Sequence, residues 1–240
     1  MNVGVIVFPG SNCDRDALRA IDDVLGAGTA TRVWHEARSL DGIDAIILPG
    51  GFSWGDYVRT GALARFAPIM DAVRDAADAG VPVLGICNGF QVLCEARLLP
   101  GALLRNDHSR FRCDIVDVTV DATSTPWTCA IDVGATLRLP IAHGEGRYHA
   151  DDDVLDALEA EGRVVARYAG ANPNGSRHAI AGVSSAAGNV VGMMPHPERA
   201  VHDWMGSSDG ALVLESLRRH LTTFRAPSTR QLVGAHADSH

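Results

Sequence analysis

Long runs of basic residues are absent from the 240-residue chain, and its formal net charge is −8. Binding to nucleic acid requires clustered positive charge, so no nucleic-acid partner is expected. Apolar runs long enough to cross a membrane, roughly 18 residues, are absent too. The first apolar stretch follows Met1 without the basic segment of a signal peptide. We therefore expect a cytoplasmic protein that has no membrane partner.

Cysteine is scarce and irregularly spaced. The five cysteines are odd in number and include no CxxC pair, which argues against a disulfide framework and against a structural zinc site. We expect no metal site, and free thiols fit a reducing compartment. What the chain does contain is 46% hydrophobic and 21% charged residues. This balance is typical of a globular protein with a sizeable core.

Short apolar strands alternate with helical patterns over the first hundred residues. A Val/Ile-rich run at 2–8 ends at Pro9-Gly10, and helical spacing follows until Gly26. Such alternation predicts βαβ units and a mostly parallel sheet. The middle of the chain instead alternates polar and apolar residues, as a strand with one solvated face does.

We predict an α/β fold in three layers, with a mostly parallel sheet, helices on both of its faces and a β-rich insertion. The α/β rhythm returns near residue 151 and continues to a helix around 209–223. One domain is therefore predicted over residues 1–224. Residues 225–240 have little periodicity and are predicted to form a flexible tail.

One cysteine lies at a predicted strand-to-helix turn. Residues 85–89 read Gly-Ile-Cys-Asn-Gly, which is the G-x-S-x-G nucleophile elbow with cysteine in place of serine. Such a turn projects its central residue at the carboxyl end of the sheet, where open α/β folds bind ligands. The adjacent helix N-terminus favours a thiolate. The alternative is that Cys87 only fills the core, as most free cysteines do and as we expect for Cys94.

A thiol nucleophile needs a base, and the base needs a group that orients it. His196 and Glu198 stand in the Pro-flanked segment "GMMPHPERA". Side chains at positions i and i+2 of an extended segment share a face, so Glu198 can reach His196 and fix its tautomer. Taken without the elbow, His196 would be interpreted as an ordinary surface-loop histidine.

Acyl chemistry also needs donors for an oxyanion. The backbone amide of Asn88, at the start of the helix after Cys87, is one candidate. The glycine-rich turn "LPGGFSWGDY" offers a second at Gly51, because glycine lets the backbone approach a ligand closely. The alternative for Gly50-Gly51 is an ordinary turn.

Together these motifs resemble the class I, triad-type, glutamine amidotransferases. Within that class, the segments "FPGSNCDRD", "PGGFSWGDYVRTGA" and "GMMPHPERA" are similar to a narrower family, the glutaminase subunits of phosphoribosylformylglycinamidine synthases. The resemblance extends from about residue 2 to residue 224. It implies a glutamine-hydrolysing enzyme of de novo purine biosynthesis.

The resemblance implies a role for each residue of the motifs. Cys87 would attack the side-chain amide carbon of glutamine and form a thioester. His196 would act as general base and then protonate the leaving ammonia, and Glu198 would orient His196. The backbone amides of Gly51 and Asn88 would hold the oxyanion.

Four further residues are implied to contact glutamine. One lies a helical turn beyond the nucleophile on the same helix face, and three belong to a segment that resembles the part of the family lining the glutamine site. That segment could equally be a plain turn between two strands. The four residues are Gln91, His143, Gly144 and Glu145.

The resemblance also implies partners. Ammonia would pass to a large synthetase subunit that uses ATP and Mg to convert formylglycinamide ribonucleotide into formylglycinamidine ribonucleotide, and a small third subunit would join the complex. This chain contains no GxxxxGK[ST] phosphate-binding loop, so we expect no cofactor in it. We predict that residues 51–62 and 172–176 form part of the partner-facing surface.

Two other interpretations remain open. A glutaminase or thiol hydrolase of the same class could serve another pathway, such as vitamin B6, carbamoyl phosphate or GMP synthesis, with the same Cys–His–Glu set. The segments "FPGSNCD" and "GGFSWGDY", which those relatives lack, argue against it. The second is an inactive regulatory or scaffold subunit, and the presence of Cys87, His196 and Glu198 argues against that.

Overall fold

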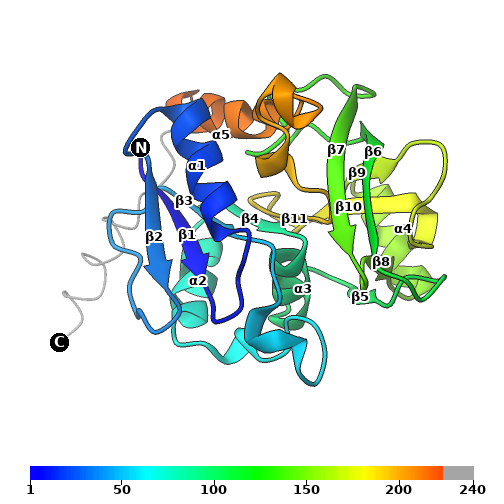
Figure 1. Ribbon diagram of the computed structural model, residues 1–240, viewed down its shortest axis with the longest axis horizontal. Coiled ribbons are helices and arrows are strands. Elements are labelled where there is room, and N and C mark those ends of the chain that lie inside the picture. The colour runs from blue at the N-terminus through cyan, green and yellow to red at the C-terminus, as the bar shows by residue number, and fades with distance from the viewer. Residues whose placement is uncertain (224–240) are drawn as a thin grey trace.

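A nine-stranded sheet forms the centre of the molecule, and helices cover it on both faces (Figure 1). The structure is a computed structural model and describes residues 1–223. The tail predicted at 225–240 lies outside the described residues. The strands follow one another across the sheet in the order β2-β1-β3-β4-β11-β10-β9-β6-β7.

The first five strands in this order are parallel. β1, β3, β4 and β11 are buried at every position, as strands covered on both faces are. This half of the sheet confirms the α/β fold that the short apolar runs predict. Its strands are β1 Val3–Val7, β2 Ala30–Trp34, β3 Ala45–Leu48, β4 Val83–Ile86 and β11 Val190–Met193.

The remaining four strands pair in antiparallel fashion. They extend the same sheet, so the sheet is mixed and the predicted β-rich insertion continues it. The polar/apolar alternation predicted at residues 111–121 falls on β6, which alternates in burial only in its second half, whereas β7 alternates along its whole length. These strands are β10 Ile180–Ser184, β9 Val164–Tyr168, β6 Arg112–Val120 and β7 Thr136–His143; β5 Ala102–Leu104 and β8 Arg147–His149 form a separate pair.

The helices lie on opposite faces because of the direction of the crossovers. The β1–α1–β2 and β3–α2–β4 units run in opposite directions along the sheet, and right-handed crossovers then place α1 and α2 on different faces. α5 contacts α1, whereas α2 and α3 both contact η2. The α-helices are α1 Asp14–Leu25, α2 Ile69–Asp78, α3 Asn88–Glu95, α4 Asp152–Ala160 and α5 Ala211–Thr223. The 3₁₀ helices are η1 Ser53–Asp56, η2 Ala64–Phe66, η3 Arg177–Ala179, η4 Pro197–Arg199 and η5 Asp203–Met205.

The core fixes the position of α3. Phe90 of α3 and Tyr148 of β8 are fully buried, and their rings are stacked with centroids 5.9 Å apart. A Cβ atom at Gly192 of β11 would lie only 2.1 Å from the Phe90 ring, so the helix sits directly on the strand. Among residues 1–223, no helix combines the length and the apolar character that spanning a membrane requires.

Candidate active site

Cys87 occupies the strained turn that the G-x-C-x-G pattern predicts. β4 ends at Ile86, α3 begins at Asn88, and Cys87 between them has φ 50° and ψ −105°, a conformation that side-chain-bearing residues rarely adopt. A Cβ atom at Gly89 would lie 1.9 Å from the carbonyl oxygen of Leu48. Only glycine therefore allows α3 to approach β3 this closely.

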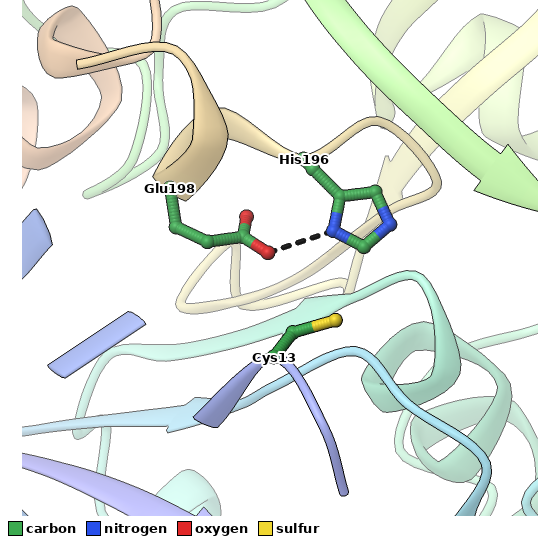
Figure 2. A group of neighbouring side chains, drawn as sticks. All are labelled: Cys13, His196 and Glu198. Atoms are coloured by element: carbon green, nitrogen blue, oxygen red, sulfur yellow. Dashed lines mark hydrogen bonds and ion pairs between the residues drawn. The ribbon is translucent and has the colours of Figure 1, made fainter. Parts of the chain in front are cut away.

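His196 and Glu198 form a buried pair (Figure 2). His196 Nδ1 is 2.7 Å from Glu198 Oε1, and the two side chains are 1% and 3% exposed. His196 Nε2 is buried and has no hydrogen-bond partner within the described chain. Burial opposes a charge on the ring, but the Glu198 carboxylate and Cys87 outweigh it, so the pKa of His196 lies well above its usual value.

The sheet brings the nucleophile and the base together. β4 and β11 are parallel neighbours, with Ile86 opposite Met193. Cys87 follows the first strand and His196 follows the second, so both lie at the carboxyl edge of the sheet. Cys87 is close enough to His196 for its charge to help raise the imidazole pKa. The Cys87 Sγ atom also lies 3.7 Å from the carbonyl oxygen of Ala142.

The two predicted oxyanion donors lie on adjoining segments. Asn88 is the first residue of α3, and the first amides of a helix have no acceptor within it. The Asn88 side chain accepts a hydrogen bond of 3.1 Å from the backbone N–H of Ser53, which ties the loop after Gly51 to the start of α3. Gly51 has φ 147°, and a Cβ atom there would lie 2.8 Å from the nitrogen of Asn12. Their oxyanion role stays a prediction.

Gln91 and Glu145, two of the predicted glutamine contacts, lie side by side. The Gln91 amide donates to the Glu145 carbonyl oxygen at 2.6 Å and accepts from the Asn88 amide at 2.8 Å. The Glu145 carboxylate accepts from the Thr60 hydroxyl at 3.0 Å. A hydrogen-bonded chain therefore connects the start of α3 with the β7–β8 turn.

His143 and Gly144 belong to the wall of this site. His143 Nδ1 is 3.1 Å from Asn106 Oδ1, and its Nε2 is 3.5 Å from the Asn174 amide. Burial, and then the charge of His196, lower the pKa of His143 to about 4, so its ring is neutral at pH 7. Both ring nitrogens thus face protein groups. Gly144 accepts a hydrogen bond at its carbonyl oxygen from the Asn106 N–H.

The prediction that residues 172–176 face a partner is wrong at its centre. Asn174 is fully buried, and its amide donates to the carbonyl oxygen of Gly146 at 2.8 Å and to the Tyr168 hydroxyl at 3.2 Å. The Asn174 amide also lies 3.5 Å from His143 Nε2, so this loop packs against the wall of the candidate site. A polar Asn/Gly/Ser run looks like an exposed turn in the sequence, and only the tertiary contacts show otherwise.

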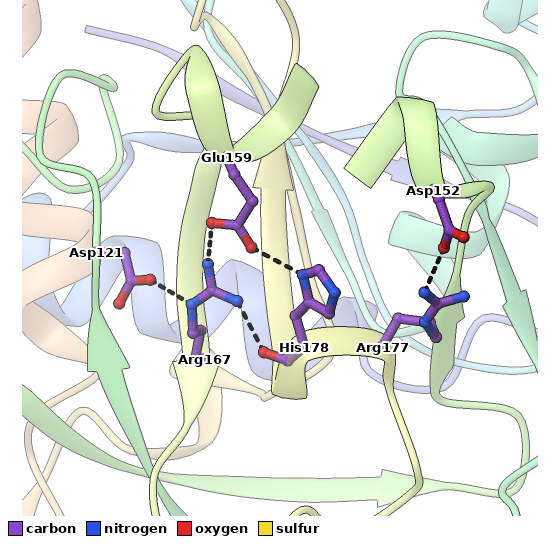
Figure 3. Close-up of polar contacts among 6 residues, drawn as sticks. All are labelled: Asp121, Asp152, Glu159, Arg167, Arg177 and His178. Atoms are coloured by element: carbon purple, nitrogen blue, oxygen red, sulfur yellow. Dashed lines mark hydrogen bonds and ion pairs between the residues drawn. The ribbon is translucent and has the colours of Figure 1, made fainter. Parts of the chain in front are cut away.

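A network of ion pairs holds this loop against the rest of the insertion (Figure 3). Arg167 of β9 donates to Asp121 at 2.6 Å, to Glu159 of α4 at 2.5 Å and to the carbonyl oxygen of His178 at 2.8 Å. Glu159 also contacts the His178 ring at 3.0 Å. Arg167 and Tyr168 are successive residues of β9, so their side chains point to opposite faces. Arg167 anchors the insertion, and the Tyr168 hydroxyl accepts a hydrogen bond from Asn174, which in turn contacts His143.

Cys13, Gly50 and Arg199 support the base, a role that the sequence did not reveal for any of them. A Cβ atom at Gly50 would lie 2.7 Å from His196 Cε1, so Gly50 leaves room for the ring. Arg199 donates to Cys13 Sγ at 3.0 Å and to Asp16 at 2.9 Å. These contacts fasten η4 to the start of α1. The residues are up to 186 positions apart, so no local pattern could have revealed them.

Cys13, His196 and Glu198 could in principle hold a metal ion, since their ligand atoms lie within 4.8 Å of one another (Figure 2). The Arg199 guanidinium lies 3.0 Å from Cys13 Sγ, and its positive charge disfavours a cation there. The Nδ1 atom of His196 is already committed to Glu198. The arrangement suits the orientation of a base better than metal binding.

Asp56 is expected to make stability depend on pH. Burial raises the pKa of its carboxyl group to about 6, against the hydrogen bonds from Gly61 and Asn88. The folded protein therefore holds this proton more tightly than the unfolded chain, and the stabilisation present below about pH 4 is lost as the pH rises through 6. Replacing Asp56 by asparagine removes this loss. Above pH 6 the free energy of unfolding should then rise by about 1 kcal/mol, a figure that allows for solvent screening.

Thermal denaturation at pH 5 and pH 7.5 measures this effect. The difference in Tm between the Asp56→Asn variant and the natural chain should shift in favour of the variant from pH 5 to pH 7.5. Asp41→Asn, at an exposed position, is the matched control and should show no such gain. If the Asp56→Asn variant differs from the natural chain by the same Tm at both pH values, the expectation is wrong.

The fold and the Cys–His–Glu arrangement define a class I glutamine amidotransferase. The family model described as CobB/CobQ-like glutamine amidotransferase domain matches residues 1–223. Phosphoribosylformylglycinamidine synthase subunit PurQ of Salinibacter ruber is 53% identical over 232 residues, which cover 93% of this chain and 98% of that protein. The subunit PurQ of Rhodococcus jostii is 58% identical over 210 residues, covering 88% and 92%.

A solved structure agrees with these sequence relatives. The structure of PurLQS from Thermotoga maritima contains a chain that matches with a TM-score of 0.84 and 46% identity, over 92% of this chain and 98% of that one. The chain therefore belongs to the PurQ family of glutamine amidotransferases, as the motifs around Cys87 and Gly51 predict.

Proposed function

We propose that this chain is the glutaminase subunit of a phosphoribosylformylglycinamidine synthase of de novo purine biosynthesis. The observation that carries the proposal is the buried His196–Glu198 pair at the end of β11, next to the strained Cys87 at the end of β4. The high identity to PurQ proteins over nearly the whole chain supports the choice of pathway.

The reaction is the hydrolysis of glutamine to glutamate and ammonia. His196, whose pKa is raised, holds the proton that leaves the Cys87 thiol, and Cys87 Sγ attacks the side-chain amide carbon. The resulting oxyanion accepts hydrogen bonds from the backbone amides of Gly51 and Asn88. When the intermediate collapses, His196 gives its proton to the leaving ammonia and a thioester forms. Water, activated by His196, then breaks the thioester and releases glutamate.

Each supporting group has a defined task in this scheme. Glu198 holds the His196 ring in one tautomer and stabilises its positive charge. The Gln91 side chain and the segment 143–145 bind the substrate glutamine, and the hydrogen-bonded chain through Asn88 fixes their relative positions. Both ring nitrogens of His143 face asparagines. The segment 143–145 is therefore best placed to contact glutamine through its backbone.

The ammonia passes to a synthetase subunit. That partner binds ATP and Mg and converts formylglycinamide ribonucleotide into formylglycinamidine ribonucleotide, so this chain itself needs no cofactor. The PurLQS assembly of the Thermotoga maritima relative supports a complex with a large synthetase and a small third subunit.

The coupled reaction tests this proposal. The chain alone should release glutamate slowly from glutamine, and the synthetase with its nucleotide substrates should accelerate the release. Glutamate and formylglycinamidine ribonucleotide should then form in a ratio close to one. Fast glutamate release by the isolated chain, or release that never yields the ribonucleotide product, would refute the partner-dependent role.

A further inference from the structure

An arginine-lined groove surrounds the C-terminal end of α3. The chain contains no lysine, so all 21 of its basic residues are arginine. Two hollows of 560 and 520 Å³ share Arg65, Glu95 and Arg97 in their walls, and we call them together the α3 groove. Its arginines are Arg59, Arg65, Arg74, Arg97 and Arg163.

The α3 groove keeps a positive charge although acidic residues lie in and near it. Glu95 is shared by Arg59 at 2.7 Å and Arg65 at 3.9 Å. Asp71 pairs with Arg74, and Glu161 pairs with Arg163. Arg97 is exposed and has no ion-pair partner among residues 1–223. Five arginines thus face three carboxylates on a chain whose net charge is −8.

One exposed apolar side chain, Phe66, lines the α3 groove, and two more, Tyr57 and Val58, directly precede its Arg59 in the sequence. Tyr57, Val58 and Phe66 are 75%, 89% and 71% exposed. The Arg65 guanidinium lies over the Phe66 ring, 4.4 Å from its centroid. Aromatic residues and arginine are the types enriched where proteins bind one another, and they supply most binding hot spots.

The α3 groove is linked to the candidate active site through the loop that carries Arg59. Thr60, the next residue, donates to the Glu145 carboxylate. A Cβ atom at Gly61 would lie 2.9 Å from the backbone of Gln91, so the loop rests on α3 itself. Glu95 lies one helical turn beyond Gln91. A molecule bound in the α3 groove would therefore contact the same loop and helix that position the glutamine-binding residues.

We propose that the α3 groove binds an acidic segment of the synthetase subunit. The inference rests on the proposed function, which supplies the partner. Charge complementarity selects an acidic ligand, because the α3 groove is a positive region on an acidic chain. The two adjoining hollows and the apolar rim fit an extended polypeptide with apolar side chains, whereas a small anion would leave Tyr57, Val58 and Phe66 uncovered.

Two variants of the full chain test the proposal by the affinity of their complex with the synthetase. Arg97→Glu should weaken binding at least tenfold at 0.1 M salt, and the loss should shrink at 0.5 M salt because screening weakens charge interactions. Phe66→Ala should weaken binding at both salt concentrations. Neither residue belongs to the catalytic machinery, so the glutaminase activity of each isolated variant should equal that of the natural chain.

Arg219→Glu is the matched control, since Arg219 is exposed on α5, which packs against α1. It should leave affinity unchanged. If both groove variants bind the synthetase as tightly as the natural chain does, the docking proposal is overturned while the proposed function stands. Binding of inorganic pyrophosphate that depends on Arg97, with unchanged assembly, would assign the groove to a small anion instead. A natural chain that neither binds the synthetase nor hydrolyses glutamine would refute the proposed function itself.

Discussion

Replacing Cys87 by alanine is expected to lower glutamine hydrolysis by at least about 10⁴-fold. The substitution removes the atom that forms the thioester. Cys13, the other thiol near His196, lies at the N-terminus of α1 and is held by Arg199 at 3.0 Å, so we expect no replacement nucleophile. In the complex with the synthetase, product formation from glutamine should stop. Added ammonium chloride should restore it, because the substitution leaves the synthetase intact.

Cys94→Ala is the matched control for this experiment. Cys94 lies in the same helix and is also buried, and burial raises the pKa of its thiol so that it stays protonated. It accordingly has the properties of a core residue. The control should keep its glutaminase activity within a few-fold of the natural chain. Equal activities for the Cys87 and Cys94 variants would exclude Cys87 as the nucleophile.

Replacing Gly89 by alanine is expected to destabilise the fold strongly. The added methyl group would lie 1.9 Å from the carbonyl oxygen of Leu48 and 2.6 Å from its carbonyl carbon. Both atoms belong to the backbone of a central strand, so α3 would have to move away from β3. We expect a loss of at least about 3 kcal/mol in the free energy of unfolding, and therefore a fall in Tm of roughly 6–12 °C.

Gly144→Ala tests whether the Gly89 effect reflects this close approach. The nearest atom to a Cβ at Gly144 would be Phe111 Cδ2 at 3.7 Å, an ordinary contact. Its Tm should therefore change by no more than a few degrees. Calorimetry of both variants makes the comparison, and a Gly89→Ala protein as stable as the Gly144→Ala protein would show that α3 adapts freely.

The parallel half of the fold could be predicted because its signals are local. Short apolar runs that end in glycine or proline mark β1, β3 and β4, and the glycines around Cys87 mark the turn after β4. The pairing of the insertion could not be predicted in this way. β6 pairs with both β7 and β9, and a polar/apolar alternation states only that one face is solvated.

The same distinction applies to the site. Cys87, His196 and Glu198 carry recognisable short motifs, and the structure brings them together at the ends of neighbouring strands. Asn106 carries none, and the segment 172–176 around Asn174 is predicted from the sequence to face a partner rather than to support the site. Asn106 is 37 positions from the histidine ring it holds, and a buried asparagine looks the same in a sequence as one in an exposed turn.

The candidate site lies at the seam where the sheet changes from parallel to antiparallel pairing, between β11 and β10. The parallel half supplies the reacting groups, Cys87 and His196, and the antiparallel half supplies the surrounding wall, which includes His143 at the end of β7. The reacting groups and the pocket wall therefore come from separate parts of the sheet. Insertions or exchanges in the antiparallel half can reshape the pocket during evolution, while the thiol and its base stay in register. The same catalytic residues can in this way serve different acceptor enzymes.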